Sequence, residues 1–523
     1  MKNMHELIGK TAHFIGIGGV SMSGIAKCFA QNGITVQGSD SALTDSKYMK
    51  QFEELGIKLF SSHESSNITN EVSLIVKTST VPEGNPEMMQ AQKLGIKIIE
   101  RFEALELILS QFEIRVGISG SSGKTTTTAL CWEAIKSSTT TLPSCIIGTV
   151  LNEVNSSVFI NEKSNICVVE ADESDGSFAD MNFTVAIITD IDADHLDHKR
   201  YNNNRENLIA HFHKFVQNAL ESNGIVIFNA NCKTTVELMQ NFTQYKSSIF
   251  SYSGIDKVAS FKNIHQVGES VFANCYLKEA RNLPNAVEFS CGGVVELENV
   301  KIPMIGKLNA FNALPALIVA SKLLQNTTNT VFNSFKGANK RVEIVGEVEV
   351  NGRSITVIDD YAHSPKKIKA FIDSFSSYCK DINAEFVIIC EPHKYTRVES
   401  LYNEYLTCFD GCNYLIMMEI FGIQGRDVQQ DVSSEKLVRD IEELWKAKRS
   451  IIEPAVEPNS GRNFVIKNLK FNKIILSHNT FAFMEEFFGQ KRKVFYVFLG
   501  AGYSNKYAHL LYEQLRNYNV CRS

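Results

Sequence analysis

Short apolar runs recur along the chain, and most of them end in glycine, serine, threonine or an acidic residue. The runs that predict strands cover residues 12–17, 35–38, 74–77, 114–118, 166–169, 185–189, 354–358, 386–390, 414–418 and 495–499. Patterns typical of helices follow several of these runs, at 23–32, at 125–135 and beyond Pro86 and Pro365. Strands that alternate with helices predict βαβ units with parallel strands. We therefore expect an α/β protein.

The alternation falls into three stretches, which agrees with a length of 523 residues at about 150 residues per domain. We predict an N-terminal Rossmann-like domain at 1–105, a central P-loop ATPase-type α/β domain at 106–334 and a C-terminal Rossmann-like α/β domain at 335–523. Hinges are expected near 101–113 and 334–341. The stretch 229–300 carries only short alternating runs, which predict edge strands or an insertion.

The composition is that of an ordinary globular protein, with 44% apolar and 21% charged residues. A net charge of −5 gives no electrostatic footprint for nucleic acid, because nucleic-acid-binding domains are usually basic. No apolar run reaches the roughly 18 residues that span a bilayer, and Met1 to Lys10 lacks a signal-peptide core. The 12 cysteines form no C-x-x-C pair. We expect reduced thiols, a cytoplasmic location and no membrane partner.

The segment Gly120-Ser-Ser-Gly-Lys-Thr-Thr126 follows a predicted strand and opens a predicted helix. In this setting backbone N–H groups and the helix N-terminus face phosphate oxygens. Lys124 is expected to reach the β- and γ-phosphates of a nucleoside triphosphate, and Thr125 to offer its hydroxyl to Mg²⁺. The strict fingerprint has glycine where this chain has Ile118, so the predicted cradle is a variant. The competing interpretation is a turn that only caps a helix.

Acidic residues follow two further predicted strands of the central domain. Glu170 comes directly after the strand at 166–169. Because the carboxyl ends of parallel strands meet at one edge of a sheet, Glu170 is expected to bind Mg²⁺ beside the phosphates. The alternative is a solvated acidic loop. The strand at 185–189 leads into a run of Asp and His residues, in which we expect His195 to be functional and His198 to lie at the surface.

The N-terminal strand runs into a glycine-rich segment, Gly16 to Gly24, and the next strand ends before Asp40. An acidic residue about 20 positions beyond the glycines is typical of a dinucleotide-binding βαβ unit and suggests NAD. Ser21 occupies the third glycine position, and the same geometry would hold any diphosphate, including that of a UDP-sugar. Asp40 is expected either to face a ribose hydroxyl or to cap a turn or helix. Asn85 is expected to cap a helix.

Strands of the last domain also end in polar residues, at Asp359-Asp-Tyr-Ala-His363 and at Glu391-Pro-His-Lys-Tyr-Thr-Arg397. Open α/β sheets bind ligands at the carboxyl ends of their strands. Lys394 and Arg397 are spaced to place two cations near one carboxylate, as an amino-acid substrate requires. The alternative is a solvated basic face.

Taken together, these motifs resemble those of the Mur ligase family, and in particular its alanine-adding branch. The motifs occur in family order across nearly the whole chain: His13-Phe-Ile-Gly-Ile-Gly-Gly19, Met22-Ser-Gly-Ile-Ala26, Gly120-Ser-Ser-Gly-Lys-Thr-Thr-Thr-Thr128, Glu170-Ala-Asp-Glu-Ser-Asp175, Asp194-His195-Leu-Asp197, Gly306-Lys-Leu-Asn309-Ala-Phe-Asn312, Asp359-Asp-Tyr-Ala-His363, Pro392-His-Lys-Tyr-Thr-Arg397 and Gly500-Ala-Gly502. The chain departs from the family's usual Gly, His, Asn, His, His and Arg at Ser21, Ser122, Asp190, Leu308, Ser364 and Lys394.

The resemblance implies an ATP-dependent, Mg²⁺-requiring ligase that joins L-alanine to UDP-N-acetylmuramic acid through an acyl phosphate, in peptidoglycan precursor synthesis. It implies catalytic roles for Lys124, Glu170 and His195, with Thr125, Glu170 and His195 as metal ligands. The implied ATP site comprises Gly120, Ser121, Ser122, Gly123, Lys124, Thr125, Thr126, Asn309, Asn312 and Arg341. The implied UDP-sugar site comprises Gly16, Gly18, Gly19, Ser23, Asp40 and Ser79, and the implied amino-acid site comprises His363, His393, Lys394 and Arg397.

Some alternatives stay open at this point. Asn309 and Asn312 are three residues apart at the start of an apolar helical run, so both amides can face one ligand, although Asn309 could instead cap the helix. Either His195 or His363 could accept the proton of the attacking amine. Competing functions are an NAD-dependent enzyme, a Mur ligase that adds another amino acid or a peptide, and a catalytically weak nucleotide-binding relative. We expect a monomer or homodimer.

Overall fold

The computed structural model describes residues 4–41, 46–79, 81–192, 196, 198–254, 273–325, 327–339, 341–412, 414–422, 432–452, 466–468 and 493–520. The described strands form three sheets. By compactness the chain divides into two units. The first unit comprises Met1–Ala280, Phe289–Ile302 and Ala310–Ala338, and the second comprises Arg281–Glu288, Pro303–Asn309 and Asn339–Ser523.

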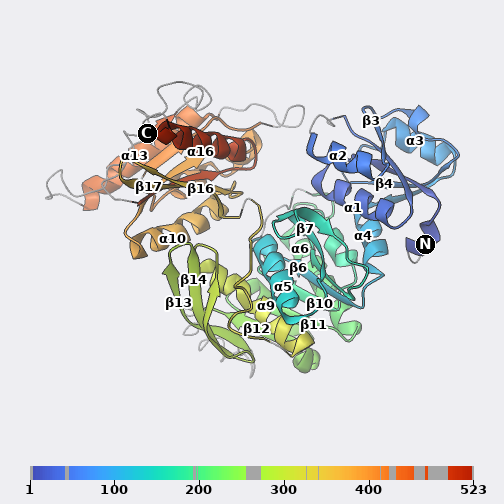
Figure 1. Cartoon of the computed structure of the whole chain (residues 1–523), viewed down its shortest axis with the longest axis horizontal. Helices are drawn as coiled ribbons and strands as arrows, with labels where there is room; N and C mark the ends of the chain where they lie inside the picture. The colour runs from blue at the N-terminus through green and yellow to red at the C-terminus, as the bar shows by residue number, and fades with distance from the viewer. Residues whose placement is uncertain are drawn as a thin grey trace. The chain divides into compact units, whose positions relative to one another are not determined.

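The first sheet has the strand order β3-β2-β1-β4-β5, and its strand pairs are parallel. Its strands are β1 (Thr11–Ile15), β2 (Thr35–Ser39), β3 (Lys58–Phe60), β4 (Val72–Lys77) and β5 (Lys97–Glu100). The helices beside it in Figure 1 are α1 (Val20–Gln31), α2 (Ser46–Glu54), α3 (Pro86–Lys93) and α4 (Arg101–Leu109). This order is that of Rossmann-like folds, as predicted for the N-terminal domain.

Local sequence explains where the first helices begin. Helix α1 starts at Val20, three residues before the predicted start, because Gly19 is extended (φ −65°, ψ 144°) and serves as the N-cap. The predicted cap of α3 is confirmed, since Asn85 Oδ1 accepts hydrogen bonds from the N–H groups of Glu87 and Met88 at 2.9 and 3.2 Å. The domain boundary predicted between residues 105 and 106 falls inside α4, which buries Leu105, Leu107, Ile108 and Leu109.

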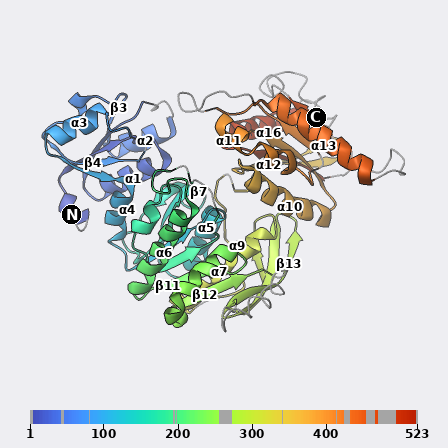
Figure 2. The same ribbon diagram turned by 180° about the vertical axis from the view of Figure 1, so that it is seen from behind.

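The second sheet has the order β15-β14-β13-β12-β11-β10-β6-β9-β7-β8. Its strands are β6 (Ile114–Ser119), β7 (Ser144–Leu151), β8 (Ser156–Phe159), β9 (Ile166–Glu170), β10 (Val185–Ile188), β11 (Ile225–Asn229), β12 (Ile249–Ser253), β13 (Cys275–Leu283), β14 (Ala286–Gly293) and β15 (Leu297–Ile302). Figure 2 shows its helices α5 (Lys124–Ser138), α6 (Arg205–Glu221), α7 (Lys233–Met239) and α9 (Leu308–Leu324). Strand β6 lies between β9 and β10 and is parallel to both. The stretch 229–300 supplies the strands at one end of the sheet, as predicted.

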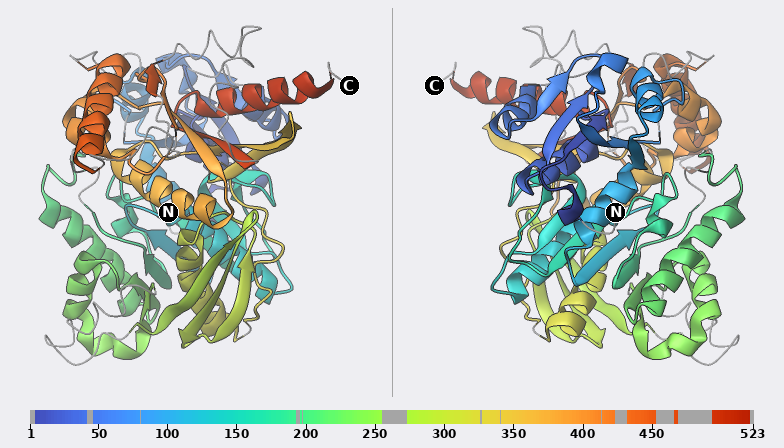
Figure 3. Two further views of the ribbon diagram at one scale, coloured as in Figure 1. Left: turned by 90° about the vertical axis from the view of Figure 1, so that its left-hand side faces the viewer. Right: turned by 90° about the vertical axis from the view of Figure 1, so that its right-hand side faces the viewer.

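The third sheet has the order β16-β17-β21-β18-β19-β20, and only its first described pair is antiparallel. Its strands are β16 (Glu343–Val350), β17 (Arg353–Asp360), β18 (Glu385–Cys390), β19 (Tyr414–Met417), β20 (Ile466–Asn468) and β21 (Lys493–Leu499). Its helices are α10 (Pro365–Asp381), α11 (Tyr395–Ser400), α12 (Tyr402–Thr407), α13 (Ser434–Ile452) and α16 (Ser504–Val520). Helix α13 (orange) and α16 (red) lie on opposite sides of the sheet in Figure 3 and join separate hydrophobic cores.

Within the first unit, α1 packs closely on β8. A Cβ added at Gly24 of α1 would lie 2.2 Å from Val158 Cγ2 of β8, so only glycine allows this approach. The end of strand β7 in the second sheet is held by backbone contacts. Leu151 forms a β-bridge with Ala338, and the Asn152 N–H donates to the Gly337 carbonyl at 3.2 Å. The described cysteines are free thiols. No helix in the described ranges is long and apolar enough to cross a membrane.

Candidate active site

The predicted phosphate cradle lies between β6 and α5, in the strand–loop–helix setting that the sequence predicted. Gly120 and Gly123 have φ values of 139° and 81°, which favour glycine. A Cβ at Gly120 would lie 2.2 Å from Thr189 Oγ1 and 2.8 Å from the Asp190 backbone nitrogen. Space and backbone conformation therefore both require glycine at position 120. The loop leads directly into α5, which begins at Lys124.

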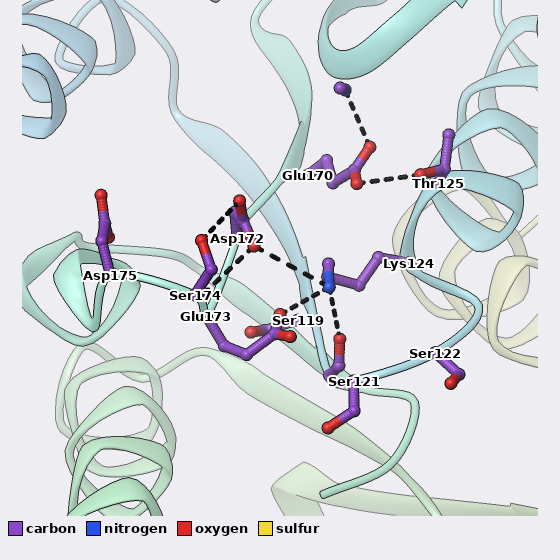
Figure 4. Close-up of polar contacts among 12 residues, drawn as sticks. Ser119, Ser121, Ser122, Lys124, Thr125, Glu170, Asp172, Glu173, Ser174 and Asp175 are labelled. Carbon is purple, nitrogen blue, oxygen red and sulfur yellow. Dashed lines mark hydrogen bonds and ion pairs between the residues drawn. The ribbon is translucent and has the colours of Figure 1, made fainter. Parts of the chain in front are cut away.

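Lys124 has three oxygen partners from the protein itself. Its Nζ lies 2.6 Å from Glu173 Oε2 and 3.9 Å from Asp172 Oδ1, and it donates to the Gly120 carbonyl at 2.7 Å. Figure 4 shows the lysine pointing toward these carboxylates. Burial alone would lower the pKa of Lys124, but Glu173, Asp172 and Glu170 raise it above its ordinary value. The lysine is therefore a cation that already holds an anionic partner.

Glu173, the strongest of these partners, is almost completely buried, at 1% exposure. Burial raises the pKa of Glu173, although Lys124 opposes the rise. The Tyr201 hydroxyl donates to the Glu173 backbone carbonyl and fixes the loop from the other side. A carboxylate in this position is costly to leave unpaired. Sequence analysis missed Glu173, although it lies within the acidic run that begins at Glu170.

Thr125 and Glu170 lie together as predicted. The Thr125 hydroxyl donates to Glu170 Oε1 at 2.9 Å, and the Gly148 N–H donates to Glu170 Oε2 at 2.8 Å (Figure 4). Hydroxyl and carboxylate oxygens are the ligands that Mg²⁺ prefers, and phosphates and water usually complete its shell. The donor set therefore fits the ion. His195, the third predicted metal ligand, lies outside the described residues.

The loop's backbone is braced by the segment after β10. The Ser122 N–H donates to Asp190 Oδ1 at 2.8 Å, and the Asp192 N–H donates to Ser121 Oγ at 3.0 Å. Asp190 is one of the positions where the chain departs from the Mur ligase pattern. A carboxylate thus occupies a loop N–H that a phosphate would otherwise use, and it adds a negative charge there. Thr126 continues the first turn of α5.

Asn309 and Asn312 lie one turn apart at the start of α9. Asn312 Oδ1 would lie 3.2 Å from a Cβ at Gly123, which places Asn312 beside the phosphate loop. The Asn309 amide donates to the Ile305 carbonyl at 2.8 Å. A cap would instead accept a hydrogen bond from a helix N–H. Their contact with adenine stays a prediction.

The glycine-rich loop of the first sheet is held by an aspartate. The Gly18 N–H donates to Asp40 Oδ2 at 2.9 Å, and a Cβ at Gly18 would lie 2.8 Å from the same oxygen. Gly16 has a φ of 81°, which favours glycine. Gly19 caps α1, in which Ser23 is buried, and Ser79 lies in the turn after β4. Asp40 therefore faces the loop, and a sugar-nucleotide contact by these six residues stays a prediction.

A buried polar cluster supports the first sheet and was not found by sequence analysis. Glu87 is fully buried and accepts hydrogen bonds from Ser39 Oγ at 2.6 Å and Asn67 Nδ2 at 2.8 Å. His13 and His63 also lie 3.2 and 3.1 Å from its carboxylate. Burial opposes ionisation, but these hydrogen bonds lower the pKa of Glu87. The sequence signal was a glutamate in the first turn of α3, which by itself indicates only a helix start.

In the second unit, His363 lies close to His393, which is also predicted to bind the amino-acid substrate. Its ring centroid is 5.6 Å from that of His393, and its Nδ1 lies 2.7 Å from the Tyr361 carbonyl, to which it donates. Burial lowers the pKa of His363 to about 3, and Lys367, Arg397 and His393 add to the effect. His363 is therefore neutral at physiological pH.

Lys394 has an unusual backbone conformation for a residue other than glycine, with φ 68° and ψ 125°. Its N–H donates to the Phe421 carbonyl at 2.8 Å, and it immediately precedes α11, which carries Arg397. Strained residues of this kind concentrate at functional sites. Arg341, which is predicted to bind ATP, belongs to the same unit. Its guanidinium carbon lies 5.5 Å from the centre of the Tyr361 ring.

Comparisons with known proteins cover most of the chain. Three family models match: "Mur ligase family, catalytic domain" at residues 11–113, "Mur ligase middle domain" at 118–320 and "Mur ligase, glutamate ligase domain" at 340–464. A protein of Rickettsia bellii named UDP-N-acetylmuramate--L-alanine ligase is 34% identical over 438 residues, which are 83% of this chain and 86% of that protein. The protein of the same name from Rickettsia canadensis is 33% identical over 84% of this chain and 88% of its own length.

Solved structures share the fold. The UDP-N-acetylmuramate-alanine ligase of Thermotoga maritima aligns with a TM-score of 0.67 at 21% identity, over 97% of this chain and 99% of that one. A murein peptide ligase from Psychrobacter arcticus aligns with a TM-score of 0.58 at 18% identity, again over 97% of this chain and 99% of that one. Both proteins extend the similarity over the whole three-sheet architecture.

Proposed function

Because the chain belongs to the Mur ligase family, we propose that it is the ATP-dependent ligase that joins L-alanine to UDP-N-acetylmuramate in peptidoglycan precursor synthesis. The observation that carries this proposal is the similarity, over 83% of the chain, to relatives that bear this name. The Lys124 loop and the Thr125–Glu170 pair supply the nucleotide site that such a reaction requires. ATP and UDP-sugars are cytoplasmic metabolites, so we place the protein in the cytoplasm. We further propose that it is a monomer or a homodimer.

The chemistry follows from the inertness of a carboxylate toward an amine. The muramoyl carboxylate attacks the γ-phosphorus of ATP, the bond to the β,γ-bridging oxygen breaks, and an acyl phosphate and ADP form. The neutral alanine amine then attacks the acyl carbon, and inorganic phosphate leaves. Catalysis of phosphoryl transfer depends mainly on positioning and on stabilising charge.

The phosphate loop has several roles in that scheme. Its backbone N–H groups between Gly120 and Lys124, other than the Ser122 N–H that Asp190 holds, bind phosphate oxygens, and Lys124 moves from Glu173 to the transferring phosphoryl group. Thr125 and Glu170 would hold Mg²⁺, which would offset the charge of the β- and γ-phosphates. Asn312, beside Gly123, is placed to contact the nucleotide. The family resemblance implies two Mg²⁺ ions, and on that basis we assign His195 to the second ion, distinct from the one that Thr125 and Glu170 would hold.

Basicity argues against His363 as the proton acceptor. The alanine amine has an ordinary pKa near 8, whereas burial lowers the pKa of His363 to about 3. A base that weak takes a proton from an ammonium group only at a large energetic cost. We propose that His363, with His393, Lys394 and Arg397, orients the amino acid, whose carboxylate faces the two cationic side chains.

The proposal is tested by phosphate release from ATP with UDP-N-acetylmuramic acid, Mg²⁺ and one of alanine, glycine or serine. We expect release that requires the sugar nucleotide and is fastest with alanine. Release with another amino acid in preference would identify a different branch of the family. Nucleotide binding without release in any mixture would show a catalytically weak relative and would contradict the ligase proposal.

A further inference from the structure

Arg101 connects two loops that belong to different sheets. It is the first residue of α4, and its side chain is 22% exposed. Its Nη1 donates to Ser21 Oγ at 3.3 Å, and its Nη2 donates to Asp175 Oδ2 at 3.1 Å. Ser21 lies in the first turn of α1, directly after the glycine-rich loop. One guanidinium therefore contacts both the start of α1 and the acidic loop after β9.

The acidic loop carries this contact on toward the phosphate cradle. Asp175 Oδ1 accepts a hydrogen bond from the Ser177 N–H at 2.9 Å and another from the Ser177 hydroxyl, so its carboxylate is fixed in orientation. Glu173, two residues earlier, is the 2.6 Å partner of Lys124. Polar contacts at Arg101 and at Lys124, joined by the backbone from Glu173 to Asp175, thus connect Ser21 with Lys124.

The elements at both ends of this path are held in place. The close packing of Gly24 on Val158 restrains α1 against the middle sheet. The Glu100 N–H donates a hydrogen bond to Glu103 Oε2 at 2.8 Å, which fixes the first turn of α4. A planar guanidinium with two occupied edges is itself rigid, because both contacts must be kept at once. A change at the glycine-rich loop therefore acts on Asp175 through Arg101.

We propose that Arg101 is a positioning residue that couples occupancy of the glycine-rich loop by a sugar nucleotide to the arrangement of the acidic loop beside Lys124. Each ligand then strengthens the binding of the other, since coupling between two sites is reciprocal. This inference rests on the proposed function, which supplies the two ligands. Arg101 touches neither reacting group in this scheme, and it acts through Ser21 and Asp175.

Arg200 offers a matched control. It also joins the two sheets of the first unit, with its Nη1 2.5 Å from Asp180 Oδ2, its Nη2 4.0 Å from Glu100 Oε2 and its guanidinium carbon 5.5 Å from the Phe102 ring centre. Its Nη1 also donates to the Gly176 carbonyl at 3.4 Å, so Arg200 touches the acidic loop, but it contacts neither Ser21 nor a side chain that binds Lys124. Loss of Arg200 therefore reports what a bridge between the sheets contributes without the contact to Ser21.

The test measures the dissociation constant of a non-hydrolysable ATP analogue by calorimetry, with and without saturating UDP-N-acetylmuramic acid. For the unmodified protein we expect the sugar nucleotide to tighten analogue binding by about fivefold or more. In Arg101→Gln we expect that factor to fall close to one, while each ligand alone binds within about twofold of its normal affinity. Arg200→Gln should keep the factor, and Arg101→Lys should restore it only in part.

Several results would overturn the inference. They are an unmodified protein that binds both ligands without coupling, an Arg101→Gln variant that keeps full coupling, and an Arg200→Gln variant that loses it equally. If Arg101→Gln does not fold, Asp175→Asn replaces it, because the amide keeps the Ser177 contacts and removes the charge that Arg101 meets. A protein that couples the ligands normally in Arg101→Gln and still releases phosphate would refute only the role of Arg101. Failure to bind UDP-N-acetylmuramic acid at all would overturn the proposed function together with this inference.

Discussion

At the scale of single residues, the most informative feature is that Lys124 already has a carboxylate partner. The sequence predicted a lysine aimed at phosphates, and the structure shows it bound to Glu173 and the Gly120 carbonyl. We therefore expect nucleotide binding to be an exchange of partners, in which the polyphosphate replaces Glu173. The net gain is the difference between two strong interactions in a buried site.

Replacement of Lys124 tests the central role of this residue. Lys124→Met keeps an unbranched side chain that is only one atom shorter and removes the charge, so we expect phosphate release to fall by about a thousandfold. Lys163→Met, at an exposed turn of the same unit, should keep normal activity. Steady-state phosphate release gives both values, and a loss smaller than tenfold in Lys124→Met would contradict the assignment.

Asp190 allows a prediction in the opposite direction. Asp190→Asn keeps an oxygen that accepts the Ser122 N–H but removes a negative charge beside the phosphate loop. We expect the ATP analogue to bind roughly threefold to tenfold more tightly, because the substitution removes Coulomb repulsion between the carboxylate and the phosphates. Calorimetry measures the change, with Glu221→Gln at the end of α6 as a charge-matched control. Weaker binding in Asp190→Asn would mean that the carboxylate has a positive role in the site.

At the scale of elements, helix α3 shows how one cap supports a buried cluster. Asn85 caps α3 directly before Glu87, which holds His13, His63, Ser39 and Asn67. Asn85→Ala should lower the free energy of unfolding by about 1 kcal/mol, because two helix N–H groups lose their acceptor. Urea unfolding measures the loss, and Asn85→Asp should recover most of it. Equal stability of all three proteins would show that the cap contributes nothing.

The alternation of strand and helix patterns made the elements predictable from the sequence. Contacts between residues far apart in the chain could not be predicted in this way. The strand, glycine loop and helix around Lys124 follow from a local pattern, as does the Asn85 cap. Helix α1 was predicted three residues too late, because the sequence does not reveal that Gly19 is extended. Arg101 contacts residues that are 74 and 80 positions away in the sequence, and no periodic pattern in the sequence predicts such contacts. The Asp40 contact to Gly18 likewise depends on how β1 and β2 pair.

At the scale of the whole molecule, the second unit contains a buried histidine that makes its stability depend on pH. His363 belongs to the second unit and has a pKa of about 3 in the folded protein against 6.5 when unfolded. Because the folded state disfavours the charged imidazole, His363 contributes stability above pH 6.5 that is lost as the pH falls toward 3.

This dependence yields a measurable difference between two proteins. The contribution of His363 to the free energy of unfolding should be about 1.4 kcal/mol smaller at pH 5.5 than at pH 7.5. The reason is that pH 5.5 lies one unit below the pKa of the unfolded histidine, and one unit corresponds to about 1.4 kcal/mol. His363→Gln keeps a donor for the Tyr361 carbonyl and does not titrate. Thermal unfolding midpoints from pH 7.5 to 5.5 should therefore fall less steeply in His363→Gln than in the unmodified protein. Parallel curves would show that His363 is not held neutral by the fold.

The pairing of Lys124 with Glu173 has a consequence for the crowded solution around the protein. Inorganic phosphate and other small anions would have to displace a buried carboxylate while offering few compensating contacts. We expect a ligand with a long anionic tail, such as the polyphosphate of a nucleotide, to offset the cost of that displacement. We therefore expect the Lys124–Glu173 ion pair to disfavour binding of small anions at this site and to favour a nucleotide over them.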